Sequence, residues 1–197
     1  MNFLAHLHLA DISNTSLAAN LAGDFAKGAI DGHPQSLRQG IWLHRQIDKI
    51  TDEHELSREL LAKFPKGLTR GAGILMDLAF DHMLARYWDE YHHQPLAEFS
   101  QRAYASLKAS ADLPESLRAV LPRMEQEDWL MAYAGRQGLN QAISGVRKRL
   151  SRPELLDNAE KVVEKMDVEI EIAFRTLYPQ LMAYSRRLAR TTPAEFL

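Results

Sequence analysis

The 197-residue sequence contains no cysteine, and this absence excludes several classes of site. Disulfide scaffolds, cysteine nucleophiles and thiolate metal centres all require the thiol group. Histidine, aspartate and glutamate remain as metal ligands, a set that suits Mg²⁺, Mn²⁺, Fe²⁺ or Zn²⁺. A metal site in this protein would therefore be built from imidazole and carboxylate groups.

Long hydrophobic runs and a strong net charge are also missing from the sequence. No apolar run approaches the roughly 18 residues that indicate a membrane-spanning helix. The N-terminal stretch MNFLAHLHLAD lacks a basic leader and is too short for a signal peptide, so we expect a cytoplasmic protein. A formal net charge of −2 argues against general binding of nucleic acid, and electrostatic recognition must come from local patches.

Alternating strand patterns of useful length are absent, whereas helical periodicity runs through almost the whole sequence. We therefore predict an all-α, single-domain helical bundle over residues 1–197. Ser16 or Asn14 is expected to cap the second helix, and Pro179 to kink or break the last one. The predicted helices are 3–10, 15–28, 35–50, 53–63, 68–90, 95–109, 115–136, 138–150 and 153–189.

The segment GIWLHRQIDKITD places His44 four residues before Asp48. A helix advances about 100° per residue, so the two side chains share one face, beside Ile41 and Ile47. A solvated pair would more often lie opposite the apolar side. Taken alone, the pair could still be a surface histidine beside an acid that forms a salt bridge.

Two further helices aim acids at apolar faces. Asp77 and Asp81 are four residues apart in a helix that is apolar almost all round, where desolvation and mutual repulsion make two carboxylates costly. A metal ion, an arginine or a shared proton would compensate them. Asp24 lies on the side of Leu17 and Leu21, next to a glycine that permits close approach of another group.

The N-terminal segment adds His6 and His8, which diverge by about 200° on a helix, so at most one can face a given site. A lone core histidine is more often hydrogen-bonded than metal-bound. Three helices that each aim an acid inward, one with a histidine partner, nevertheless favour a carboxylate–imidazole metal site of the kind that helical bundles build. Such ligands favour Mn²⁺ or Mg²⁺ over Fe²⁺ or Zn²⁺.

Five segments together resemble the acyl carrier protein phosphodiesterase family, in order and in spacing. They are MNFLAHLHLA at the start, NLAGDF at 20–25, GIWLHRQID at 40–48, MDLAFDHMLARYW at 76–88 and FRTLYPQLMAYSRR at 174–187. The resemblance covers nearly the whole chain. It implies a divergent relative of the HD-domain phosphohydrolases with a divalent metal, preferably manganese. The implied reaction releases 4′-phosphopantetheine from a serine of holo-acyl carrier protein.

The usual HD signature has an adjacent His-Asp pair, which this sequence lacks; Asp81 and His82 stand in the reverse order. The helix faces derived above favour four metal ligands, with His6 and Asp77 next in line as ligands or as partners of ligands. The four are Asp24, His44, Asp48 and Asp81.

The reaction assigns roles to further residues. Asp48 or Asp77 would orient or deprotonate the attacking water, and His82 would protonate the leaving oxygen. Arg45 would clamp the phosphate, unless it is simply a solvated arginine.

Acyl carrier proteins are acidic, so a docking surface should be basic. The sequence offers three basic groups, of which the first flanks the site in sequence and is best placed for docking. They are Lys27, Arg38 and Arg45; Arg147, Lys148, Arg149 and Arg152; and Arg186, Arg187 and Arg190. The pantetheine arm needs a partly apolar groove, which Phe25, Trp42 and Trp88 could line, although core packing is the commoner role of such residues.

Two other interpretations of the sequence remain open. The same chemistry could act on a nucleotide or an alarmone. Alternatively, the protein could be a binding module whose buried acids pair with Arg86 or Arg136 instead of a metal.

Overall fold

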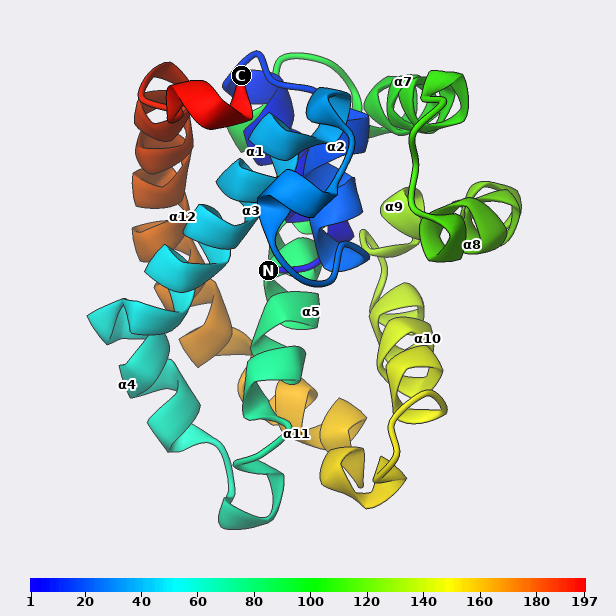
Figure 1. The fold of residues 1–197 in the computed structure, drawn as a ribbon. Helices are drawn as coiled ribbons and strands as arrows, with labels where there is room; N and C mark the ends of the chain where they lie inside the picture. The colour runs from blue at the N-terminus through cyan, green and yellow to red at the C-terminus, as the bar shows by residue number, and fades with distance from the viewer.

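The first helix, α1 (Phe3–Ile12), lies in the upper half of the molecule as drawn in Figure 1, where it contacts residues 17–21, 72–86 and 167–190. The computed structural model describes all 197 residues. Every residue from Phe3 to Ala10 is buried, including both histidines. Apolar and small side chains point in all directions from this segment, so it can be surrounded on every side, as a core helix must be.

The remaining helices follow in a continuous all-α arrangement without a strand, which confirms the predicted fold class. They are α2 (Leu17–Leu21), α3 (Gln35–Glu53), α4 (Glu55–Lys63), α5 (Ala72–Arg86), α6 (Trp88–Tyr91), α7 (Leu96–Ala109), α8 (Glu115–Gln126), α9 (Trp129–Ala132), α10 (Arg136–Arg147), α11 (Ala159–Lys165) and α12 (Asp167–Arg190). Short 3₁₀ turns are η1 (Ala22–Asp24), η2 (Ile30–Gly32), η3 (Lys66–Leu68), η4 (Pro153–Leu156) and η5 (Ala194–Phe196).

One hydrophobic core of 48 buried residues extends from α1 to α12, which makes the chain a single compact domain. The long helix α12 packs against α1, α3, α4 and α5, and so closes one side of the bundle. None of the helices is long and apolar enough to span a lipid bilayer.

Four predicted helices are shorter than expected, and two of them are broken beside a residue in the left-handed conformation. The predicted helix 115–136 ends at Asp128, whose φ is 40°, and the predicted helix 153–189 is divided near Asn158, whose φ is 57°. The predicted helix 68–90 divides at Tyr87, and the predicted helix 15–28 ends at Asp24. Asparagine and aspartate tolerate the left-handed conformation better than most residues, but periodicity alone does not show where it occurs.

Of the two outcomes predicted at Pro179, the break is wrong, because α12 continues through this residue, and the kink stays a prediction. Burial of the neighbouring Leu177, Tyr178 and Leu181 outweighs the missing backbone donor of proline. Ser16 does cap α2, since its hydroxyl accepts a hydrogen bond from the backbone N–H of Ala19.

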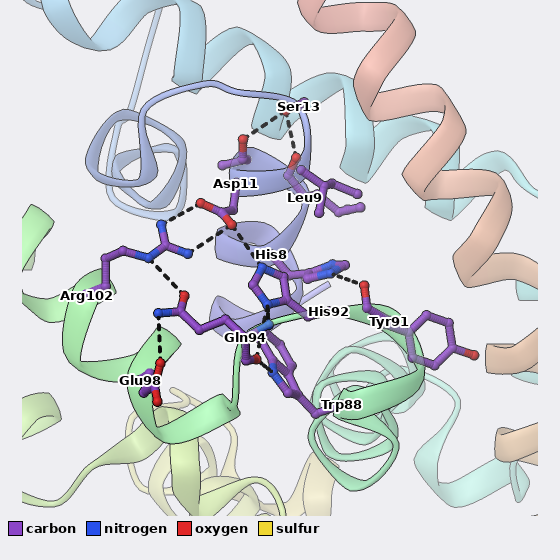
Figure 2. Close-up of polar contacts among 12 residues, drawn as sticks. His8, Leu9, Asp11, Ser13, Trp88, Tyr91, His92, Gln94, Glu98 and Arg102 are labelled. Carbon is purple, nitrogen blue, oxygen red and sulfur yellow. Dashed lines mark hydrogen bonds and ion pairs between the residues drawn. The ribbon is translucent and has the colours of Figure 1, made fainter.

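A polar network ties the end of α1 to the start of α7 (Figure 2). The Asp11 carboxylate accepts two hydrogen bonds from Arg102, at 2.6 and 3.0 Å, and one from Nε2 of His92 at 3.0 Å. The Nδ1 atom of His92 accepts the backbone N–H of Gln94, and the indole of Trp88 donates to the Gln94 carbonyl. Partial burial opposes ionisation of Asp11, but these partners lower the pKa of its carboxyl.

Replacing Asp11 with asparagine should lower the free energy of unfolding at pH 7 by about 1–3 kcal/mol, because Arg102 and His92 lose a charged acceptor. The lowered pKa means that this contribution is present above about pH 4 and is lost as the pH falls through the native pKa. Urea unfolding of both proteins at pH 7 and in acid measures the difference, which should narrow in acid. Glu127→Gln, which removes an exposed ion pair, is the control and should cost less than about 1 kcal/mol.

Candidate metal and active site

Two imidazoles and one carboxylate converge between α1 and α3. Nε2 of His6 lies 2.9 Å from Oδ1 of Asp48, and Nε2 of His44 lies 3.2 Å from Oδ2 of the same carboxylate. The two rings are stacked, with their centroids 3.7 Å apart. One donor atom from each residue lies within 4.8 Å of the others, which makes the three a candidate metal-binding group.

The helices place these side chains by simple periodicity. His44 and Asp48 are one turn apart on α3, as the sequence predicts, and His6 comes from the buried α1. His8 points elsewhere: its Nδ1 accepts from the Tyr178 hydroxyl at 2.7 Å, and its Nε2 donates to the Tyr91 carbonyl. Only one of the two α1 histidines therefore faces the site, as their angular separation predicts.

Gly23 allows His44 to occupy its position. A methyl group added at Gly23 would lie only 2.3 Å from Cγ of His44. Only glycine leaves room for the His44 ring at this position, in agreement with the prediction that the glycine beside Asp24 permits close approach of another group.

Asp24 borders the group from η1, with its Oδ1 atom 3.6 Å from Nε2 of His44. Burial raises the pKa of this carboxyl to about 6, and the nearby Asp48 raises it further while His44 opposes the shift. Asp24 is thus close enough to contribute a further oxygen ligand after a small movement.

Asp77 joins the site through the α-ammonium group of Met1, a contact that no sequence pattern indicates. The ammonium nitrogen lies 3.0 Å from Asp77 and 3.3 Å from Asp48. Burial opposes this charge, but the two carboxylates raise the pKa of the ammonium group to about 11. A positive charge is therefore already stabilised between Asp48 and Asp77, which is an electrostatic environment that also suits a metal cation.

The protonation states suit metal ligands. Burial, together with the neighbouring His44, lowers the pKa of His6 to about 3, so this imidazole is neutral at pH 7. Burial opposes ionisation of Asp48, but His6 and the hydrogen bonds from both imidazoles hold its pKa well below the usual range. Neutral imidazole and ionised carboxylate are the forms that bind metal.

Asp81, a predicted ligand, is fully buried and uses both oxygens for backbone groups of α1. It accepts the N–H of Leu4 at 2.7 Å and the N–H of Ala5 at 3.1 Å. Burial raises its pKa to about 7, although these two hydrogen bonds act in the opposite direction. The structure therefore gives Asp81 a second role, as the cap of α1, and does not bring it into the group of His6, His44 and Asp48.

His82 and Arg45 have other contacts. Nδ1 of His82 donates to the Tyr133 carbonyl at 2.6 Å, and no contact joins His82 to the candidate site. Arg45 donates to the Ala26 carbonyl at 2.9 Å, which places it against the loop that follows Asp24. A phosphate-binding role for Arg45 stays a prediction.

The interpretation in which arginines compensate the buried acids is wrong. Arg86 and Arg136 both pair with Asp167 at the start of α12, and not with Asp77 or Asp81. The buried acids are compensated instead by the Met1 ammonium group and by backbone donors of α1.

Aromatic rings form a row beside the site, of which the sequence pattern indicated only Phe25. Phe25, next to Asp24, stacks on Phe3 at 6.1 Å, and Phe3 stacks on Trp129 of α9 at 6.3 Å. Phe25 and Trp129 are partly exposed. Trp88, for which core packing was the more common of the two expected roles, is a core residue that is 3% exposed and donates to the Gln94 carbonyl. Trp42 is partly buried against the main core.

Replacing Gly23 with alanine should lower the free energy of unfolding by about 1–3 kcal/mol, because either His44 or the backbone must move away from the new methyl group. The matched control is Gly73→Ala in α5, where nothing lies within 4 Å of the added methyl. That change should leave stability unchanged or raise it by up to about 1 kcal/mol. Urea unfolding of the three proteins gives the comparison, and equal stabilities would contradict the packing argument.

Comparisons with known proteins identify relatives over most of the chain. The profile of a family described as acyl carrier protein phosphodiesterase matches residues 1–181. A protein of that name from Yersinia pestis is 32% identical to this chain, over 92% of this chain and 96% of its own length. One from Escherichia coli O157:H7 is also 32% identical, over 96% of this chain and 100% of its own length. One from Salmonella newport is 33% identical, over 96% of this chain and 100% of its own. No solved structure matches, so the relation to HD-domain enzymes stays a prediction. On the extent and identity of these matches, the chain belongs to the acyl carrier protein phosphodiesterase family, which are hydrolases of a phosphodiester.

Proposed function

We propose that this protein uses a divalent metal to hydrolyse the phosphodiester that joins 4′-phosphopantetheine to a serine of holo-acyl carrier protein. The observation that carries the proposal is the convergence of His6, His44 and Asp48 within 4.8 Å, in a chain of this family. Family membership favours the carrier protein as substrate over a nucleotide or an alarmone.

The residues fit a divalent ion by their chemistry. Two imidazole nitrogens and a carboxylate form the centre of the site, and Asp24 and Asp77 supply further oxygens at its edge. The sequence predicted one imidazole among four ligands and so favoured Mn²⁺ or Mg²⁺. The central group has two imidazoles, which suit Fe²⁺ and Zn²⁺ better than Mg²⁺, and we favour Mn²⁺, which accepts both kinds of ligand. When bound, the ion would supply an activated water and neutralise charge on the phosphoryl oxygens.

Asp77 is our candidate for the general base. Its pKa is raised by burial, and the Met1 ammonium group opposes that shift and holds the carboxylate in place. A carboxylate whose pKa is raised towards neutrality accepts a proton more readily. In the proposed step a water oxygen bonds to phosphorus, its proton passes to Asp77, and the phosphorus–serine oxygen bond breaks. The serine oxygen leaves as an alkoxide and takes up a proton from solvent, and Asp77 later releases its proton to solvent, giving apo-acyl carrier protein and phosphopantetheine.

The basic residues beside the site are the best candidates for binding the acidic carrier protein. Lys27, Arg38 and Arg45 form no ion pair within the protein, and both arginines donate to backbone carbonyls around the 26–33 loop. In the second group, Arg147 and Arg152 are paired with Asp157 and Glu154. The other members of the second and third groups form no ion pair either, so the position of the first group around the 26–33 loop, next to Asp24, is what favours it. Charges without an internal partner are the ones available to an acidic surface.

The aromatic row Phe25–Phe3–Trp129 is our candidate for the surface along which the pantetheine arm lies. It begins beside Asp24, which borders the proposed metal group, and continues to α9. The arm is covalently joined to the reacting phosphate, so it must leave the site along an adjacent surface. Aromatic rings provide rigid apolar area for a flexible chain of this type.

The wild-type protein, incubated with holo-acyl carrier protein and Mn²⁺, should remove the phosphopantetheine mass from the substrate, as followed by intact-protein mass spectrometry. Asp48→Asn should reduce the rate at least about 100-fold, because an amide is a far poorer metal ligand than a carboxylate. Glu53→Gln changes an exposed acid at the end of the same helix and should retain wild-type activity. The proposal fails if the wild-type protein removes no phosphopantetheine with any divalent metal.

Trp129→Ala should lower kcat/KM for holo-acyl carrier protein by about tenfold, because the outer end of the aromatic row is lost. Hydrolysis of bis(p-nitrophenyl) phosphate, which has no pantetheine arm, should be unchanged. Tyr184→Ala removes a partly exposed aromatic ring on α12 and serves as the control. Equal losses on both substrates would show that Trp129 acts on the site itself and not on the arm.

A further inference from the structure

The side chain of Asn20 on α2 is a buried polar group without a partner. The residue is 0% exposed, and neither its Oδ1 nor its Nδ2 atom forms a hydrogen bond within the protein. An amide offers two donors and two acceptor lone pairs, and leaving them unpaired in the interior is unfavourable. Leucine has nearly the same shape and would avoid this cost, so packing alone does not account for asparagine here.

Asn20 lies in the contact that positions His44. Asn20 and Gly23 are three residues apart in the helical stretch formed by α2 and η1, so they are neighbours on its surface. Gly23 touches the His44 ring, and Gly40, one turn before His44, packs closely against the backbone nitrogen of Asn20. Asn20 is therefore about one helical turn from His44 at the same helix–helix contact.

The two histidines of the site have unpaired atoms as well. Nδ1 of His6 and Nδ1 of His44 are both buried and without a hydrogen-bond partner, while their Nε2 atoms face Asp48. An imidazole that binds a metal through Nε2 must carry its proton on Nδ1, and that N–H then requires an acceptor. No carboxylate or carbonyl of the protein accepts from Nδ1 of His44.

We propose that Asn20 is a positioning residue whose amide oxygen accepts a hydrogen bond, through one internal water, from Nδ1–H of His44. This contact fixes the tautomer that presents Nε2 to the metal. The role of Asn20 rests on the proposed function only in that a metal binds to His44. A bridging water would pair the unpaired amide of Asn20 with the unpaired Nδ1 of His44, and buried waters commonly pair such atoms. The unfavourable burial of the amide is thereby linked to metal binding and not to folding.

The test is Asn20→Leu, which keeps the volume and removes the amide. Calorimetric titration with Mn²⁺ should show a Kd at least tenfold higher than that of the wild-type protein, while the thermal midpoint of the metal-free variant is unchanged or higher. Asn140→Leu on α10 removes another buried amide with an unpaired oxygen and should leave the Kd unchanged. A structural role alone would instead lower the thermal midpoint of Asn20→Leu and leave the Kd unchanged.

The ¹⁵N resonances of the imidazole nitrogens provide a second readout in the metal-free proteins. The His44 resonances should shift in Asn20→Leu and stay in place in Asn140→Leu, because only the first change alters the partner of Nδ1. A folded Asn20→Leu protein with wild-type Mn²⁺ affinity and unshifted resonances overturns the inference. If the wild-type protein binds no metal, the proposed metal dependence fails, and the resonances alone then decide the role of Asn20.

Discussion

The structure depends on the interaction between the buried Asp81 carboxylate and the start of α1. Asn2, at the N-cap position of this helix, makes no side-chain cap, and Asp81 of α5 instead accepts the N–H groups of Leu4 and Ala5. The unpaired donors and the positive end of the helix dipole make this a favourable place for a negative charge. Because the interaction fixes α1 against α5, it also fixes where His6 enters the site. Asp81 therefore matters to the active site without contacting His44 or Asp48.

Charge compensation explains how so many acids share a small volume. Asp48 and Asp77 are held by the Met1 ammonium group, and Asp48 also accepts from both imidazoles. Asp48, Asp77 and Asp81 thus each have a donor, which is the condition under which burial is tolerated. A metal ion would meet an ionised Asp48 and a neutral His6, and the imidazole proton would only have to move from Nε2 to Nδ1 to free Nε2 for the ion.

Much of this arrangement follows from the sequence, because helical periodicity specifies faces. The pairing of His44 with Asp48 and the divergence of His6 from His8 require only the helical repeat. Asp24 approaches His44 from the 3₁₀ turn η1 and not from the α-helix that the sequence predicted there. Periodicity does not specify which helices meet. It therefore could not show that Asp81 caps α1, that the Met1 ammonium group reaches Asp77, or that Phe3 stacks between Phe25 and Trp129. The helix breaks near Asp128 and Asn158 were missed for a similar reason, since a single left-handed residue leaves the apolar pattern almost intact.

The position of α12 has a consequence for the order in which the protein assembles. The residues of the proposed site all lie before position 82, yet α1, α3 and α5, which carry most of them, are packed against a helix from the end of the chain. During synthesis the early helices must wait for residues 167–190 before their apolar surfaces are covered. Contacts this distant in sequence slow folding, and they leave α1 exposed to aggregation until residues 167–190 have been synthesised. The same packing means that the site is completed only after α12 has been made.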